Sequence, residues 1–139
     1  MTRHWIVVGD GAEARIYAGD ELLKDLRHVD SLHHAHGIIT HGNEVPAANG
    51  DEWTHDAQRE AEERFARAVA KVVGDGDNRH AFERLILVAP PKFLGNLRSA
   101  LSRPTERKLV ASIHHDWVKM NLHDLSDNIR KNLPEAAGM

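Results

Sequence analysis

The apolar positions of the chain fall into short runs in some places and a helical repeat in others. Five consecutive apolar residues, 85–89, include the β-branched Ile86 and Val88 and predict a strand buried on both faces. Pro90 and Pro91 stop this strand, and a proline at a first helical position favours a helix directly afterwards. The apolar positions of that helix recur at helical spacing, at Phe93, Leu94, Leu97 and Leu101. A buried strand that leads into a helix is typical of the parallel part of an α/β fold.

The N-terminal part of the chain predicts three strands. Residues 5–9 and 14–18 are β-rich runs separated by the turn signal Asp10-Gly11, so they predict a hairpin. In this turn we expect Asp10 to accept backbone hydrogen bonds. After a second turn, residues 22–29 are interpreted as a third strand, although their apolar spacing also suits a helix.

Residues 30–54 show no periodicity and predict a long loop. Loops of more than about 12–15 residues are usually functional or disordered, so we expect deletion of residues 32–50 to leave the fold intact. The loop is rich in histidine, at His33, His34, His36 and His41. These imidazoles are candidate zinc or nickel ligands, but glycines within the cluster provide no fixed geometry, and a solvated loop is the favoured interpretation.

The clearest helical repeat lies in residues 56–73, and Gly74 is expected to end this helix. Its apolar stripe consists of Ala61, Phe65, Ala68, Val69 and Val72. Residues 108–113 predict another strand, and residues 121–133 predict a last helix with acids near its start and bases near its end.

The predicted order is three antiparallel strands followed by helix, strand, helix, strand and helix. With right-handed crossovers this order gives one α/β domain over residues 1–139, a ribonuclease-H-like three-layer fold with a mixed five-stranded sheet. Phe65 and Leu87 are then expected to be buried in packed layers of one core.

Composition excludes several classes of protein. The 139 residues are 41% hydrophobic and contain no run of about 20 apolar residues, so no membrane span is predicted. The apolar stretch near the N-terminus is shorter than a signal-peptide core, and we expect a cytoplasmic protein. The absence of cysteine excludes disulfides, thiolate zinc sites and a cysteine nucleophile.

The formal net charge of −3 argues against a general nucleic-acid binder but leaves room for a local basic surface. One concentration of cations exists, formed by Lys92, Arg98, Arg103, Arg107 and Lys108. This group is a candidate RNA-contact surface, and a solvated helix face is the alternative interpretation.

Three stretches carry a resemblance to a known family: WIVVGDGAEARIY, EAEERFARAVA and LILVAPPKFLGNLRSAL. Together they resemble the bacterial family "protein required for attachment to host cells", which is grouped with relatives of the middle domain of release factors and Pelota proteins. The residues that match the family motifs are Asp10, Arg15, Arg64, Phe65, Pro90, Pro91 and Gly95. From the residues themselves, we expect Arg15 to pair with an acid and Gly95 to permit close packing.

In release factors a Gly-Gly-Gln loop precedes a helix that begins with an Arg-Phe-Ala-Arg-like segment. Residues 64–67 match that segment, but no Gly-Gly-Gln precedes them, so the resemblance does not imply peptide release. The central strand also ends without the acid that a two-metal nuclease requires. The expectation is a non-catalytic binding module, associated with the ribosome or RNA, that uses no cofactor. The alternatives are a regulatory or protein-interaction domain with an indirect effect on host attachment, and a metal-dependent hydrolase that uses the histidines.

Overall fold

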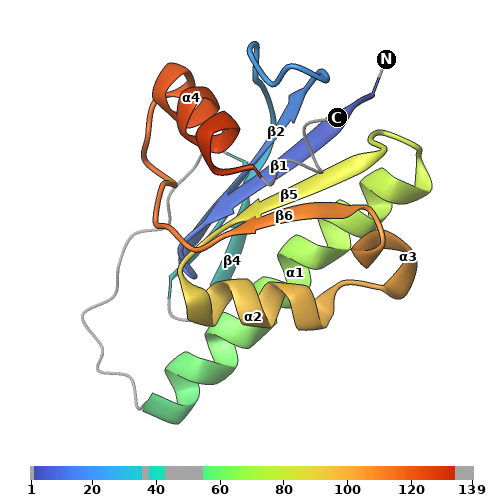
Figure 1. Cartoon of the computed structure of the whole chain (residues 1–139). Coiled ribbons are helices and arrows are strands. Elements are labelled where there is room, and N and C mark those ends of the chain that lie inside the picture. Colours follow the sequence, from blue (N-terminus) through green and yellow to red (C-terminus); the bar gives the residue numbers. More distant parts are fainter. Residues whose placement is uncertain (1, 36–37, 43–54, 134–139) are drawn as a thin grey trace.

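The computed structural model describes residues 2–35, 38–42 and 55–133, which are organised around a six-stranded mixed sheet (Figure 1). The strands are β1 (His4–Gly9), β2 (Glu13–Gly19), β3 (Arg27–Ala35), β4 (Ile38–His41), β5 (Arg84–Val88) and β6 (Leu109–Ile113). They lie in the order β4-β3-β2-β1-β5-β6. β1 to β4 pair antiparallel, whereas β5 and β6 continue the sheet in parallel from β1. The α/β class predicted from the sequence is therefore confirmed.

Helices cover both faces of this sheet (Figure 1). They are α1 (His55–Asn78), α2 (Pro91–Ala100), the short α3 (Arg103–Glu106) and α4 (Leu122–Asn132). α1 and α2 pack on one face and α4 packs on the other, which gives two hydrophobic clusters. Phe65 and Leu87 are fully buried in the first cluster, as expected. None of the described helices is long and apolar enough to cross a membrane.

The hairpin and the central strand form as the sequence predicts. Asp10 Oδ1 accepts hydrogen bonds from the backbone N–H groups of Ala12 and Glu13, both at 2.9 Å, and Gly11 adopts the positive φ of +96° that this turn requires. In β5, Leu87 faces the α1–α2 cluster while Ile86 faces the α4 cluster. The strand is thus buried on both faces, as its continuous apolar run indicated.

The prediction of five strands and a loop over residues 30–54 is wrong. The third strand begins at Arg27, not at residue 22, because Asp20 Oδ1 caps a turn at Leu22 and Leu23, where Leu23 has a φ of +54°. β3 then continues to Ala35 and pairs with β4, and Leu32 is only 2% exposed. Deleting residues 32–50 would remove this pairing and should therefore destabilise the fold. Residues 36–37 and 43–54 of the predicted loop lie outside the described residues.

The predicted end of the first helix at Gly74 is also wrong. α1 continues through Gly76 to Asn78 and closes where the Ala81 N–H donates to the Gly76 carbonyl at 2.9 Å. A Cβ added at Gly76 would lie 2.3 Å from Cη2 of Trp5, whereas one added at Gly74 would meet nothing within 4 Å. Gly76 therefore allows the helix to pack closely on a buried tryptophan and does not terminate it.

The C-terminal elements follow the prediction, apart from α3, which the sequence did not indicate. α4 begins after Asn121, whose Oδ1 accepts from the Asp124 N–H at 2.9 Å, and it ends with Arg130 and Lys131 in its last turn. The Ser126 hydroxyl donates to the Leu23 carbonyl, which joins this helix to the turn before β3.

Candidate functional site

Two of the five cations predicted to contact RNA, Lys92 and Arg98, lie on α2, which packs beside α1 on one face of the sheet. Phe65 of α1 and Phe93 of α2 stack with ring centroids 5.8 Å apart and fix the two helices on the sheet. Because Phe65 points into the core, its neighbours Arg64 and Arg67 lie on the exposed side of α1. The release-factor-like segment thus places two arginines at the surface.

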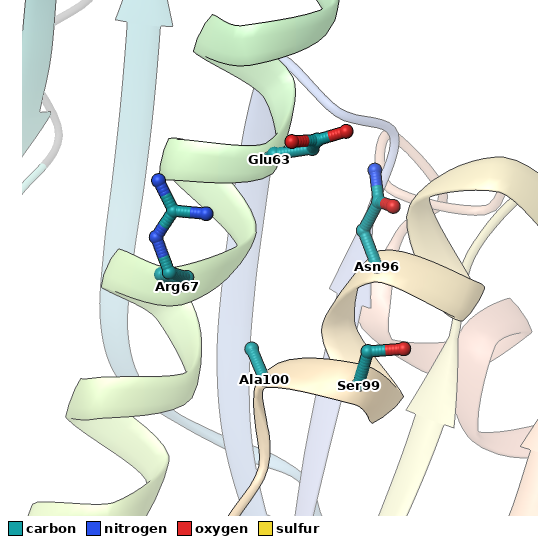
Figure 2. Close-up of a pocket in the computed structure, with 5 residues that line it drawn as sticks. All are labelled: Glu63, Arg67, Asn96, Ser99 and Ala100. Carbon is teal, nitrogen blue, oxygen red and sulfur yellow. The ribbon is translucent and has the colours of Figure 1, made fainter.

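A shallow pocket of about 220 Å³ lies between these two helices (Figure 2). Its lining consists of Glu63, Arg67, Asn96, Ser99 and Ala100. Figure 2 shows the Asn96 amide directed toward the Glu63 carboxylate, and Asn96 Nδ2 is buried without a hydrogen-bond partner among the described residues. The pocket offers a carboxylate, a guanidinium, an amide and a hydroxyl. These groups can hydrogen-bond a polar ligand.

The five predicted RNA-contact cations fall into two groups. Lys92 pairs with Glu62 at 3.3 Å, and Lys108 pairs with the buried Asp77, so both charges are compensated within the fold. The remaining three, Arg98, Arg103 and Arg107, are exposed and form no ion pair within the part of the chain that the structure describes. Arg98 lies near the end of α2, Arg103 begins α3 and Arg107 directly follows α3. The last two line a pocket of about 310 Å³ together with Glu106.

The partner of Lys108 is a structural feature that the sequence did not reveal. Asp77 accepts a hydrogen bond from the Thr105 hydroxyl at 2.8 Å, and the Lys108 ammonium also lies 5.6 Å from the centroid of the Phe82 ring. Burial opposes ionisation of Asp77, but the Lys108 ammonium and the Thr105 hydroxyl outweigh it and hold the pKa of this carboxyl below its usual range. This cluster joins the end of α1 to α3 and the start of β6.

The family-motif residues do not converge on one site. Arg15 pairs with Glu13 at 2.8 Å in the hairpin, as expected, and Arg64 and Phe65 lie on α1. Pro90 and Pro91 form the N-terminus of α2, where they fix the backbone as predicted. The expectation that Gly95 permits close packing is wrong, because a Cβ at Gly95 would meet nothing within 4 Å.

The histidines do not form a metal cluster within the described residues. His33 and His34 are neighbours on β3 and therefore point to opposite faces of the sheet. His34 Nε2 lies 2.5 Å from the Gly11 carbonyl oxygen, with its ring beside Phe65, while His41 pairs with Asp30. Over residues 2–35, 38–42 and 55–133, no three His, Cys, Asp or Glu side chains come close enough to hold a metal. His36, the fourth candidate, lies outside these residues.

Fold and motifs together define an α/β domain with an open mixed sheet and helices on both faces. Residues 5–129 match the model of the family described as "Protein required for attachment to host cells", and the chain belongs to this family. The resemblance predicted from the three sequence stretches is therefore confirmed. No curated protein matches the chain.

The solved structures that are similar to the chain include the following two. A structure described as "Archaeal protein" matches with a TM-score of 0.56 and 12% identity, over 98% of this chain and 35% of that one. The archaeal translation termination factor aRF1 matches with a TM-score of 0.49 and 11% identity, over 93% of this chain and 38% of that one. The chain thus spans about a third of the length of these structures. At such identities the similarity describes the fold alone.

Proposed function

We propose that this protein is a non-catalytic binding module that contacts RNA, with the ribosome as the expected partner, through the surface formed by α2 and α3. The observation that carries the proposal is the group of three exposed arginines, Arg98, Arg103 and Arg107, which have no ion-pair partner in the described part of the chain. Affinity for RNA comes largely from cations that neutralise phosphates, and unpaired arginines are the ones available for this role.

The adjoining pocket supports the same proposal. Arg67 on α1 and the side chains of Asn96 and Ser99 on α2 present hydrogen-bonding groups of the kinds that contact phosphate and ribose (Figure 2). Lys92 and Lys108 were predicted to belong to this surface, but their ion pairs assign them a smaller role. The sequence contains no Gly-Gly-Gln, so the proposal includes binding and no peptide release.

The test is cosedimentation with ribosomes over a range of salt concentrations. The double variant Arg98→Glu/Arg103→Glu should lose cosedimentation, because each substitution replaces attraction to phosphate by repulsion. Its matched control is Lys119→Glu/Lys131→Glu, which changes the net charge by the same amount. Both lysines are exposed; Lys131 lies in α4 and Lys119 shortly before it, on the other side of the sheet. The control variant should sediment as the wild type does.

A neutral variant measures the phosphate interactions themselves. Arg98→Gln/Arg103→Gln should reduce the slope of the logarithm of the binding constant against the logarithm of salt by about 2, one for each phosphate that the variant no longer neutralises. Both double variants should keep the wild-type melting temperature, since exposed substitutions usually change stability by less than about 0.5 kcal/mol. If the Arg98→Glu/Arg103→Glu variant and its lysine control lose cosedimentation equally, or if the wild type does not bind ribosomes at low salt, the RNA proposal is refuted. The regulatory or protein-interaction alternative would then stand.

A further inference from the structure

A second pocket lies on the opposite face of the sheet, over β2 and β3. It has a volume of about 410 Å³, and Leu122, the first residue of α4, forms part of its rim. Its other lining residues are Glu13, Arg15, Tyr17, His28, Ser31 and His33. They form three cross-strand pairs, Glu13 with His33, Arg15 with Ser31 and Tyr17 with His28, so the sheet register brings all six side chains onto one face.

Several of these polar side chains are buried, although the pocket beside them is open. Tyr17, Ser31 and His33 are only 5%, 3% and 6% exposed. The Ser31 hydroxyl lies 2.6 Å from His28 Nε2, so these two side chains share a hydrogen bond. The imidazole of His33 has no hydrogen-bond partner in the described part of the chain. The buried side-chain nitrogens without a partner among the described residues are His4 Nδ1, His34 Nδ1 and Asn96 Nδ2. The His33 nitrogens are not among them, so this imidazole reaches the open pocket and can hydrogen-bond a ligand there.

Arg15 lies at the centre of this lining and is held in place. Its Nε–H donates to Glu13 Oε1 at 2.8 Å, which uses one edge of the guanidinium and orients the rest. Burial opposes the charge of Arg15, but the Glu13 carboxylate and the Tyr17 hydroxyl outweigh it and raise the pKa of the guanidinium. A guanidinium has five N–H donors, and its planar fork matches the oxygens of a phosphate or carboxylate.

We propose that this pocket binds a small oxyanion, the phosphate or carboxylate group of a small-molecule ligand, with Arg15 as the anchor. His33 and Tyr17 supply further donors around the anion, since an imidazole N–H or a hydroxyl can each donate to an anionic oxygen. A metal is the less suitable occupant, because no three metal-ligating side chains of the described residues come together there. The pocket is separate from the proposed RNA surface, which lies across the sheet from it.

The test uses inorganic phosphate and sodium acetate as probes, with backbone amide chemical shifts of the full chain as the readout. At least one of the two probes should change the chemical shifts of the β2 and β3 backbone amides until they reach a plateau. Sodium chloride at the same ionic strength should not change them in this way. Saturation by phosphate alone would identify a phosphoryl ligand, and saturation by acetate alone a carboxylate ligand. Arg15→Gln should weaken binding about tenfold or more, because a charged hydrogen bond is removed.

Two further variants make the outcome decisive. Arg103→Gln removes an arginine of the RNA surface and should leave anion binding unchanged. His33→Gln should weaken binding several-fold and gives a second measurement if Arg15→Gln does not fold. The proposal is overturned if neither anion shifts β2 and β3 amides at concentrations in the tens of millimolar, or if the folded Arg15 and His33 variants bind as the wild type does.

Discussion

The two glycines inside α1 offer a sharp test of the packing. Gly74 and Gly76 lie in the same helix, and replacing a helical glycine by alanine normally stabilises a protein by about 0.8–1.0 kcal/mol. At Gly74 a Cβ would enter open space, so Gly74→Ala should show this gain. At Gly76 the same Cβ would lie 2.3 and 2.5 Å from Cη2 and Cζ3 of Trp5. These distances are well inside van der Waals contact, so either the ring or the helix must move.

The Trp5 ring has little room to move. It is 3% exposed and stacks on Phe82 with ring centroids 5.0 Å apart. Overpacking a core by one methyl group costs about 1–3 kcal/mol, and the closeness of this contact places Gly76→Ala near the upper end. After subtracting the gain in helix propensity, we expect Gly76→Ala to destabilise the fold by about 1–2 kcal/mol.

The measurement is urea denaturation of both variants, with melting temperatures as a second readout. The two variants should differ by about 2–3 kcal/mol in the free energy of unfolding, with Gly74→Ala the more stable. In the double variant Trp5→Phe/Gly76→Ala the contacting indole atoms are absent, so the combined loss should be smaller than the sum of the single losses. If Gly76→Ala were as stabilising as Gly74→Ala, the close approach of α1 to Trp5 would be refuted.

Four other substitutions test the fold. Asp77→Asn should lower the free energy of unfolding, measured by urea denaturation, by about 1.5–3 kcal/mol, because Lys108 loses its charged partner. In the wild type the stability that the ionised Asp77 contributes should be lost as the pH falls below the ordinary Asp pKa of 3.8 and through the lower pKa of the folded state. Burial and the charge of Arg84 lower the pKa of His4 from 6.5, so the folded protein takes up a proton at His4 less readily than the unfolded chain does. The free energy of unfolding should therefore decrease as the pH drops below 6.5, and His4→Gln should make this decrease smaller. Phe65→Ala and Leu87→Ala should cost about 3–5 and 2–5 kcal/mol respectively, and losses below about 1 kcal/mol at both would show that the core is misplaced.

Local patterns in the sequence were sufficient for much of the architecture. The continuous apolar run at β5, the Asp10 turn and the helical repeats of α1, α2 and α4 depend on residues that are close in the chain. Their periods of about 2 or 3.6 residues and their turn and cap residues carry the signal directly. The family resemblance also rested on contiguous stretches, and the family model covers the same part of the chain.

Features that depend on distant neighbours were decided only by the tertiary structure. The histidine-rich segment from residue 30 was predicted as a loop, but its first residues extend β3 because β2 offers an edge for pairing, and β4 then pairs with the edge of β3. Gly74 was expected to end the first helix, but α1 continues to Asn78, and its Gly76 packs against Trp5 of the first strand. Lys108 belongs to a run of cations in the sequence, but Asp77, 31 residues earlier, compensates its charge. The pocket around Arg15 likewise exists because the β2–β3 register places Ser31 and His33 beside Arg15 and Glu13, and register is a property of paired strands that neither strand specifies alone.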